Sequence, residues 1–202
     1  MTGPDFTFED RLMTRGATRI AGVDEVGRGP LAGPVMAAAV ILDPARIPDG
    51  LNDSKKLSPR KREMIAEEIN QTATVAIGSA SVEEIDQINI LRAAHLAMMR
   101  ALHALEPAAD TALIDGNMLP RDIRIPAHCL IKGDARSLSI AAASIVAKVA
   151  RDKIMVDLAQ QHPGYGWERN MGYPTPEHRA RLQSHGATPH HRRSFKTVHN
   201  IL

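Results

Sequence analysis

The chain has 202 residues, a formal net charge of +2, and a composition that is 44% hydrophobic. This length suits one domain, or one domain with a short appendage, and it buries a sizeable core without a disulfide or a structural metal. A single cysteine excludes a disulfide framework and agrees with a reducing compartment. No apolar run approaches the roughly 20 residues of a membrane span, and the N-terminus lacks the apolar stretch of a signal peptide. We therefore expect a soluble cytoplasmic protein with no membrane association.

The first predicted elements are two strands joined by a glycine-rich loop. Residues 19–26 are rich in Ile and Val and alternate in part, which is typical of a strand. Residues 27–34 contain glycines and prolines in the pattern of a turn. Residues 35–42 form a continuous apolar run, which indicates a second, buried strand. The two strands are expected to pair as a long hairpin.

The middle of the chain alternates predicted helices and strands. Ser58-Pro59 is a helix start, with Ser at the N-cap and Pro at the first helical position. The apolar side of this helix is expected to comprise Met64, Ile65 and Ile69. Residues 74–80 predict a third strand, and Ser81-Val82-Glu83-Glu84 is a capping box that opens a helical stretch. The residues of that stretch expected to face the core, from their helical spacing, are Leu91, Ala94, Met98, Leu102 and Leu105.

The last part of the chain predicts two short strands followed by helices. In order, these elements are a strand at 111–114, a strand at 127–131, a helix at about 138–161, a loop at 164–172, and a last helix from Thr175-Pro176 to Gly186. The whole order is three strands in meander, a helix, two strands, a helix and a helical tail. One mixed sheet with helices on its faces accommodates this order.

Four carboxylates lie at or near the ends of neighbouring strand candidates: Asp24, Glu25, Asp115 and Asp134. Asp24 and Glu25 interrupt an apolar strand, and burial of an unpaired carboxylate costs several kcal/mol or forces protonation. A metal ion or a salt bridge, for example to Arg28, offsets this cost, and the pair alone leaves both open. Asp115 ends a strand and Asp134 follows the next strand, so the four acids together favour a metal site.

The chemistry of this acidic set indicates the kind of metal. Hard oxygen donors without a set of His or Cys ligands favour Mg²⁺ or Mn²⁺ over Zn²⁺, and converging carboxylates repel one another unless cations lie among them. Two such ions about 3.5–4 Å apart can clamp the attacking and leaving oxygens of a phosphodiester. This mechanism needs no nucleophilic side chain. Cys129 could supply one, but its apolar flanks are more typical of a strand residue whose thiol pKa is raised.

The glycine-rich loop allows a rival interpretation. Residues 27–32 match the fingerprint G-x-G-x-x-A of dinucleotide-binding proteins. That fingerprint opens a helix, whereas Pro30 and Pro34 bracket a loop that leads into another strand. Two acids directly before the loop would also repel a pyrophosphate. A glycine-flanked loop beside metal ligands would instead let the backbone approach a nucleic-acid sugar closely.

The segment from residue 162 onwards is rich in basic residues and histidines. Its Lys and Arg residues are Arg169, Arg179, Arg181, Arg192, Arg193 and Lys196, and its acids are Glu168 and Glu177. Such a segment suits a phosphate backbone, although a solvated basic tail explains the same composition. Its aromatic residues could stack on sugars or bases, or pack the segment onto the domain. Lys55, Lys56 and Lys132 are candidate phosphate contacts, although each alone is more often a solvated lysine.

Several segments, in order, resemble the signature motifs of the type 2 ribonuclease H family, ribonuclease HII. They are AGVDEVGRGPLAGPV at 21–35, NDSKKL at 52–57, IDGN at 114–117, KGD at 132–134 with SIAAASIVAKVARD at 139–152, GYPT at 172–175 and HRRSF at 191–195. The resemblance spans about residues 19–198. It implies a ribonuclease H-like α/β fold, with a mixed five-stranded sheet flanked by helices and a helical C-terminal tail. It also implies a single domain at 1–202, with a catalytic core at 19–161 and a nucleic-acid-contacting segment at 162–202.

The resemblance further implies an activity. Family members cut on the 5′ side of a ribonucleotide, in RNA–DNA hybrids and in DNA carrying misincorporated ribonucleotides, and leave 3′-hydroxyl and 5′-phosphate ends. Their role is ribonucleotide removal in DNA replication and repair. The catalytic and metal-binding residues implied here, for two Mn²⁺ or Mg²⁺ ions, are Asp24, Glu25, Asp115 and Asp134. The substrate-binding residues implied are Gly27, Arg28, Gly29, Lys55, Lys132 and Tyr173.

Two of these substrate contacts have defined roles in the resemblance. Residues 27–29 are expected to read the 2′-hydroxyl, and Tyr173 to pack against the neighbouring deoxyribose. One departure is that Asn170-Met171 replaces a His-Lys pair of many members, which puts substrate affinity near Tyr173 in doubt. The chain is expected to act as a monomer and to carry no added partner-binding tail after Phe195.

Two rival functions share parts of this pattern. Another nuclease of the same fold, such as a junction resolvase or transposase core, needs the carboxylates but no 2′-hydroxyl sensor. An all-DNA duplex distinguishes it. A non-catalytic nucleic-acid-binding module would bind without turnover in the presence of metal.

Overall fold

A five-stranded mixed sheet forms the middle layer of the computed structural model, which describes residues 3–202. The strands are β1 (Ile20–Val26), β2 (Val35–Ile41), β3 (Thr74–Ala80), β4 (Thr111–Asp115) and β5 (Ala127–Leu130). Their order in the sheet is β3-β2-β1-β4-β5. The first three strands pair antiparallel, whereas β4 is parallel to β1 and β5 is parallel to β4. The predicted hairpin and mixed sheet are confirmed, and β1 is the central strand.

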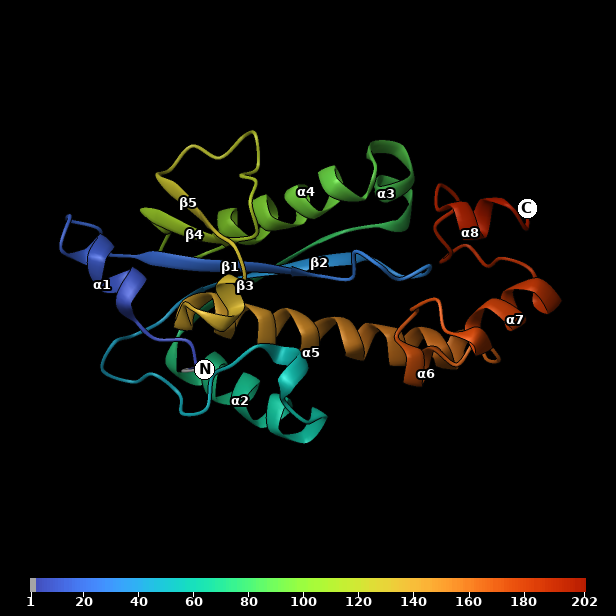
Figure 1. The fold of residues 1–202 in the computed structure, drawn as a ribbon, viewed down its shortest axis with the longest axis horizontal. Coiled ribbons are helices and arrows are strands. Elements are labelled where there is room, and N and C mark those ends of the chain that lie inside the picture. The colour runs from blue at the N-terminus through green and yellow to red at the C-terminus, as the bar shows by residue number, and fades with distance from the viewer. Residues whose placement is uncertain (1–2) are drawn as a thin grey trace.

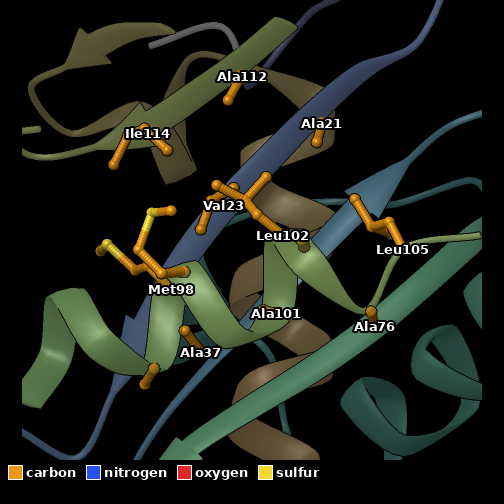
Figure 2. Close-up of a cluster of buried hydrophobic side chains, with 13 residues drawn as sticks. Ala21, Val23, Ala37, Ala76, Met98, Ala101, Leu102, Leu105, Ala112 and Ile114 are labelled. Atoms are coloured by element: carbon orange, nitrogen blue, oxygen red, sulfur yellow. The ribbon is translucent and has the colours of Figure 1, made fainter. Parts of the chain in front are cut away.

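Helices cover both faces of this sheet (Figure 1). On one face lie α3 (Val82–Ile88) and α4 (Ile90–His103), and on the other α2 (Pro59–Thr72) and α5 (Leu138–Gln161). Figure 2 shows Met98 and Leu102 of α4 packed over Val23 of β1. A Cβ at Gly78 would lie 2.2 Å from the carbonyl oxygen of Ala97, so α4 rests directly on the backbone of β3. The core on this face is therefore built from small residues and aliphatic side chains.

The long helix α5 covers the opposite face of the sheet and packs equally closely on the central strand. A Cβ at Gly22 would lie 2.1 Å from the carbonyl carbon of Ser139. Residues 139–147 of α5 are buried and include three consecutive alanines, Ala141, Ala142 and Ala143. These small residues let the helix approach the sheet closely. The first turn of α5 is thereby fixed next to β1.

The remaining helices are short and lie at the two ends of the molecule. They are α1 (Thr7–Met13), α6 (Trp167–Asn170), α7 (Pro176–His185) and α8 (Lys196–His199), with 3₁₀ turns η1 (Ser54–Lys56) and η2 (Gly133–Ala135). In Figure 1, α7 and α8 lie at the end of the molecule opposite α1. None of the helices in residues 3–202 is both long enough and apolar enough to cross a membrane.

Some details of the expected elements are wrong. The stretch 164–172 is not only loop, because α6 makes one helical turn within it. The helix ending at Gly186 is not the last one, since α8 follows it. Met64 is 63% exposed, whereas Ile65 and Ile69 are buried. Met64 precedes Ile65 by one residue and so points away from the i, i+4 stripe that contacts the core.

Candidate active site

The parallel pairing of β1 and β4 places two carboxylates side by side. Val23 pairs with Ile114, and the residues that follow them are Asp24 and Asp115. Val23 and Ile114 pack on the α4 face, so the next residue on each strand turns toward α5. Asp24 is only 7% exposed, and its Oδ1 accepts a hydrogen bond from the N–H of Glu25 at 2.7 Å. The central strand β1 thus carries a buried carboxylate near its C-terminal end.

All four predicted acids act on one another electrostatically. Burial raises the pKa of Asp24 well above its usual value, and the charges of the other three acids raise it further. A hydrogen bond from Ser144 of α5 partly opposes this rise. Burial also raises the pKa of Asp115 and of Asp134, and the charge of at least one other carboxylate raises each pKa further. The structure therefore places the other three predicted acids within electrostatic reach of Asp24.

Asp115 and Asp134 are linked through the backbone between them. The N–H of Gly133, the residue before Asp134, donates to Oδ1 of Asp115 at 2.6 Å. Gly133 also lacks the side chain that would crowd this position, since a Cβ there would lie 3.2 Å from the same carboxylate oxygen. The turn η2 is in this way held against the end of β4. A change in η2 would move both carboxylates at once.

Glu25, and not Asp24, is the acid that pairs with an arginine. Arg28 Nη1 lies 3.1 Å from Oε1 of Glu25. Within residues 3–202, Asp24 makes no salt bridge. The alternative that an ion pair with Arg28 explains the buried Asp24 is therefore wrong. Within the described residues, the carboxylate of Asp24 is thus left without a cationic partner.

The donor set suits a hard divalent cation, because its carboxylates crowd together and their pKa values are raised. In the part of the chain that the structure describes, however, no three acidic, His or Cys side chains converge as a ready ligand cage. The oxygens of Asp24 and Asp115 accept from backbone N–H groups, and Glu25 pairs with Arg28. For these carboxylates to share one ion, their side chains would have to turn inward.

The turn η1 brings further charges to the same place. The charge of Lys55 lowers the pKa of both Asp115 and Asp134, so it lies within electrostatic reach of both. The hydroxyl groups of Ser54 and Ser144 lie 2.9 Å apart and join η1 to α5. Lys132 is exposed next to η2, in the left-handed conformation with φ 56° and ψ 43°. The structure thus brings Lys55 to the acids but gives Lys132 no contact with them.

Two buried arginines hold the glycine-rich loop, and both are 0% exposed. Arg151 of α5 donates to the carbonyl oxygens of Ala32, Pro34 and Met171. Arg192 donates to the carbonyl oxygens of Gly27, Arg28, Gly33 and Pro34. Burial lowers the pKa of Arg151 to about 10 and that of Arg192 to about 9. Arg192 is therefore part of the core of the site, and its assignment to a surface basic tail is wrong.

The same loop contacts Tyr173, which is far away in sequence. A Cβ at Gly29 would lie 3.4 Å from the ring of Tyr173, so the ring lies against this glycine. The N–H of Leu31 donates to the carbonyl oxygen of Gly172 at 2.8 Å. The Tyr173 side chain remains 39% exposed. The structure thus brings Arg28, Gly29 and Tyr173 to one exposed surface, whereas Gly27 is buried against Arg151.

Asn170, at the site of the departure from the family pattern, supports the Tyr173 loop. Its Oδ1 accepts from the N–H of Gly172 at 2.9 Å, and its Nδ2 donates to the carbonyl oxygen of Tyr165 at 2.8 Å. Its own carbonyl oxygen accepts from the N–H of Tyr173 at 2.8 Å. Met171 adopts φ 49° and packs with Trp167. Here the two residues have structural contacts that explain their presence.

A buried histidine pair lies behind Tyr173. His178 Nδ1 lies 2.9 Å from the carbonyl oxygen of Tyr173 and so carries the proton, while its Nε2 accepts from Trp167 Nε1 at 3.0 Å. His191 Nδ1 accepts from the N–H of Thr188, and its Nε2 lies 3.1 Å from that of His178. Burial lowers the pKa of both rings, that of His191 to about 3. Both histidines are therefore neutral and link the C-terminal segment to Tyr173.

The aromatic residues of this segment mostly pack it onto the domain. Trp167 and Tyr165 are 0% and 5% exposed, and their rings stack with centroids 5.1 Å apart. Tyr173 is the exception. Cys129 lies half-buried on β5, and burial raises the pKa of its thiol. This agrees with a strand residue and not with a nucleophile.

The fold and the acidic rim define the class of the protein. The structure resembles that of the ribonuclease H2 from Pyrococcus horikoshii OT3, with a TM-score of 0.76 and 27% identity over 91% of this chain and 97% of the other. It also shares its fold with a Bst ribonuclease HIII solved in complex with Mn²⁺, with a TM-score of 0.69 and 23% identity over 92% of this chain and 70% of the other. The protein is a nuclease of the ribonuclease H class, as the sequence motifs predicted.

The particular family follows from the sequence relatives. The model of the family Ribonuclease HII matches residues 21–198. A curated relative from Ruegeria pomeroyi, named ribonuclease HII, is 67% identical over 100% of this chain and 86% of its own length. The chain belongs to the ribonuclease HII family. It is a hydrolase that cleaves RNA in RNA–DNA hybrids.

Proposed function

We propose that Asp24, Glu25, Asp115 and Asp134 hold two divalent ions, Mn²⁺ or Mg²⁺. We also propose that the enzyme cuts on the 5′ side of a ribonucleotide, leaving 3′-hydroxyl and 5′-phosphate ends. The observation that carries this proposal is the buried Asp24, whose pKa is raised by burial and by the three other carboxylates. Such crowding without a paired cation is costly unless metal ions offset it. The Mn²⁺ complex of the Bst ribonuclease HIII is in keeping with this site.

The residues of the chain orient this site. The N–H of Gly133 donates to Asp115 and so restricts its carboxylate, and the Ser144 hydroxyl lowers the pKa of Asp24. Lys55 places a positive charge near Asp115 and Asp134 and is suited to a phosphate oxygen. Lys132, exposed at the same rim, is proposed as a second phosphate contact. The ions, when bound, would ionise the attacking water and neutralise the leaving oxygen.

The recognition of a ribonucleotide is proposed to lie in residues 27–29 and Tyr173. The carbonyl groups of Gly27 and Arg28 already accept from Arg192. Within residues 3–202, the N–H groups of Arg28 and Gly29 donate to no backbone carbonyl, so they remain available to a 2′-oxygen. The exposed ring of Tyr173 against Gly29 offers a flat surface for the adjacent deoxyribose. A 2′-hydroxyl is the group that distinguishes RNA from DNA at such a site.

The experiment is cleavage of a DNA duplex that carries one ribonucleotide, with Mn²⁺, Mg²⁺ or a chelator, beside an all-DNA duplex of the same sequence. We expect a metal-dependent cut on the 5′ side of the ribonucleotide and an intact control. Cutting of both duplexes alike would refute 2′-hydroxyl recognition and favour another nuclease of this fold. Binding of both duplexes without a cut in any metal would refute the catalytic assignment of the four acids.

The proposal extends to the role of the protein. Removal of misincorporated ribonucleotides in DNA replication and repair requires access to chromosomal DNA, which in a bacterial cell means the cytoplasm. We propose that the protein acts as a monomer, with the catalytic core at 19–161. The segment 162–202 is proposed to contact nucleic acid through Tyr173 and its exposed basic residues Arg179, Arg181, Arg193 and Lys196.

A further inference from the structure

A buried carboxylate outside the acidic site lies at the start of α5. Glu9 of α1 is 1% exposed. Its Oε1 accepts hydrogen bonds from the Ser137 hydroxyl at 2.6 Å, the Ser139 N–H at 3.0 Å and the Ser139 hydroxyl at 2.5 Å. Its Oε2 is buried with no hydrogen-bond partner in residues 3–202. The family match begins at residue 21, so α1 lies before it.

The two serines form the junction between η2 and α5. Ser137 is the N-cap of α5, and its hydroxyl oxygen accepts from the N–H of Ile140. The backbone of Asp5 makes two hydrogen bonds to the same junction. Its N–H donates to the carbonyl oxygen of Arg136, and its carbonyl oxygen accepts from the N–H of Leu138. The backbone of Gly22 closes the junction from the side of the sheet. Residues 136–139 are thus clamped between α1 and β1.

This junction is directly connected to two of the proposed metal ligands. The N–H of Ser137 donates to the carbonyl oxygen of Gly133 at 2.8 Å. The N–H of Gly133 in turn orients Asp115, and Asp134 is the next residue. A shift of the serines would therefore move η2, the side chain of Asp134 and the hydrogen bond to Asp115 together.

The burial of Glu9 indicates that its carboxylate has a specific structural role. A buried carboxylate is costly, and here the helix N-terminus and three hydrogen bonds offset part of that cost. We propose that Glu9 is a positioning residue, which fixes the η2–α5 junction so that Asp115 and Asp134 can share a divalent ion. This inference rests on the proposed role of these two acids as metal ligands. Glu9 touches neither substrate nor metal in this proposal.

The test compares Glu9→Ala and Glu9→Gln with the unchanged full-length protein. Mn²⁺ binding to the free enzyme is measured by calorimetry, and kcat and KM are measured on the single-ribonucleotide duplex. Loss of a group that supports metal ligands weakens metal affinity by about 10–100-fold, so we expect Glu9→Ala to raise the Kd for Mn²⁺ by about 10-fold or more. We also expect a lower kcat with an unchanged KM. Glu9→Gln keeps an oxygen that can accept from Ser139 and should recover part of the loss.

The matched control is Asp10→Asn, since Asp10 is the exposed neighbour on the same helix and should change none of these quantities. If Glu9→Ala does not fold, Ser139→Ala is the deciding variant, because it removes one hydrogen bond to Glu9. It should likewise raise the Kd for Mn²⁺. A lower Tm with unchanged Mn²⁺ affinity and kcat in the folded variants would overturn the inference. Failure of the unchanged protein to bind Mn²⁺ would instead refute the metal site itself.

Discussion

Asp24 shows how a single side chain can be costly to the fold and useful to the site. Its carboxyl group is almost buried, and its pKa is raised by burial and by three neighbouring carboxylates. In the unfolded chain the same group ionises near its usual value. As pH rises from that value through the raised pKa, the unfolded chain loses its proton first, and the free energy of unfolding falls. At neutral pH the metal-free protein therefore carries a local destabilisation that a bound cation would remove.

Asp24→Asn should abolish cleavage and raise stability in the presence of a chelator. The amide has the same size but does not ionise, so the repulsion with the other acids is removed together with a ligand. Each kcal/mol of relief should raise Tm by about 2–4 °C for a chain of this length. Thermal unfolding in chelator and cleavage in Mn²⁺ measure the two effects. Asp122→Asn, at an exposed position, is the control. Full activity in Asp24→Asn would contradict the metal assignment.

Tyr173→Ala should weaken cleavage at the junction more than it weakens duplex binding. The exposed ring lies against Gly29, whereas the backbone of Tyr173 is held separately by His178. Removal of an aromatic platform costs about 1–3 kcal/mol per stacked base, which is about 5–150-fold in kcat/KM. Single-turnover cleavage and fluorescence anisotropy compare the two losses, with Tyr173→Phe as the conservative variant. Equal losses in cleavage and binding would make Tyr173 merely structural.

At the scale of elements, hydrophobic pattern alone predicted the sheet and the long helices. The capping box at Ser81 and the start at Ser58-Pro59 both occur as expected. The helices that the pattern missed are short: α6 and α8 have four residues each, and one turn is too short to show a helical period. The missed α1 is held by contacts of Glu9 and Asp5 with residues about 130 positions away. Such long-range contacts leave no periodic signal in the sequence.

The C-terminal segment supports the loops of the site and contains the buried His178 and His191. We therefore expect the free energy of unfolding to depend on the protonation of these histidines. The pKa of His191 in the folded chain is lowered to about 3 from 6.5. As pH falls below 6.5, His191 therefore takes up a proton in the unfolded chain before it does so in the folded protein. The free energy of unfolding that is present above pH 6.5 is then lost. Between pH 6.5 and pH 5 the loss from this residue is about 2 kcal/mol.

Urea unfolding at pH 7 and pH 5 tests this loss, with Trp167 as the fluorescent probe. It is the one tryptophan of the chain and contacts His178 directly. We expect His191→Gln to flatten the pH dependence. His199→Gln, at an exposed position, should leave it unchanged. An equal pH dependence in His191→Gln and the unchanged protein would contradict the assignment of the acid loss to His191.

At the scale of the whole molecule, the sequence located the acidic residues but not what holds them. The acids stood out because they interrupt or end apolar strands. Arg192 stands among other basic residues, a composition that suits a phosphate contact or a solvated tail, yet it is fully buried and donates to the glycine-rich loop. Ser144 carries no local signal of a role in the site, although it lowers the pKa of Asp24. Neither role follows from local sequence, because each depends on a partner more than 100 residues away.

The basic surface of the C-terminal segment should make substrate affinity depend on salt. Each lysine or arginine that contacts a duplex phosphate adds about 0.9 to the slope of log K against log salt concentration. Arg179→Ala with Arg193→Ala, both exposed, should lower that slope and weaken binding to all duplexes alike. Arg15→Ala, near α1 at the opposite end of the molecule (Figure 1), is the control. A flat salt response in the unchanged protein would contradict a phosphate-binding role for this segment.

The two buried arginines also set an order of events during translation. The glycine-rich loop at 27–34 leaves the ribosome early, but Arg192, which donates to four of its carbonyl groups, is made near the end. A nascent chain can therefore build its sheet while the loop still lacks its last support. The four proposed metal ligands are made long before the surface proposed to recognise a ribonucleotide is complete. On that proposal, selectivity for a ribonucleotide would be reached only after Arg192 has docked against the loop.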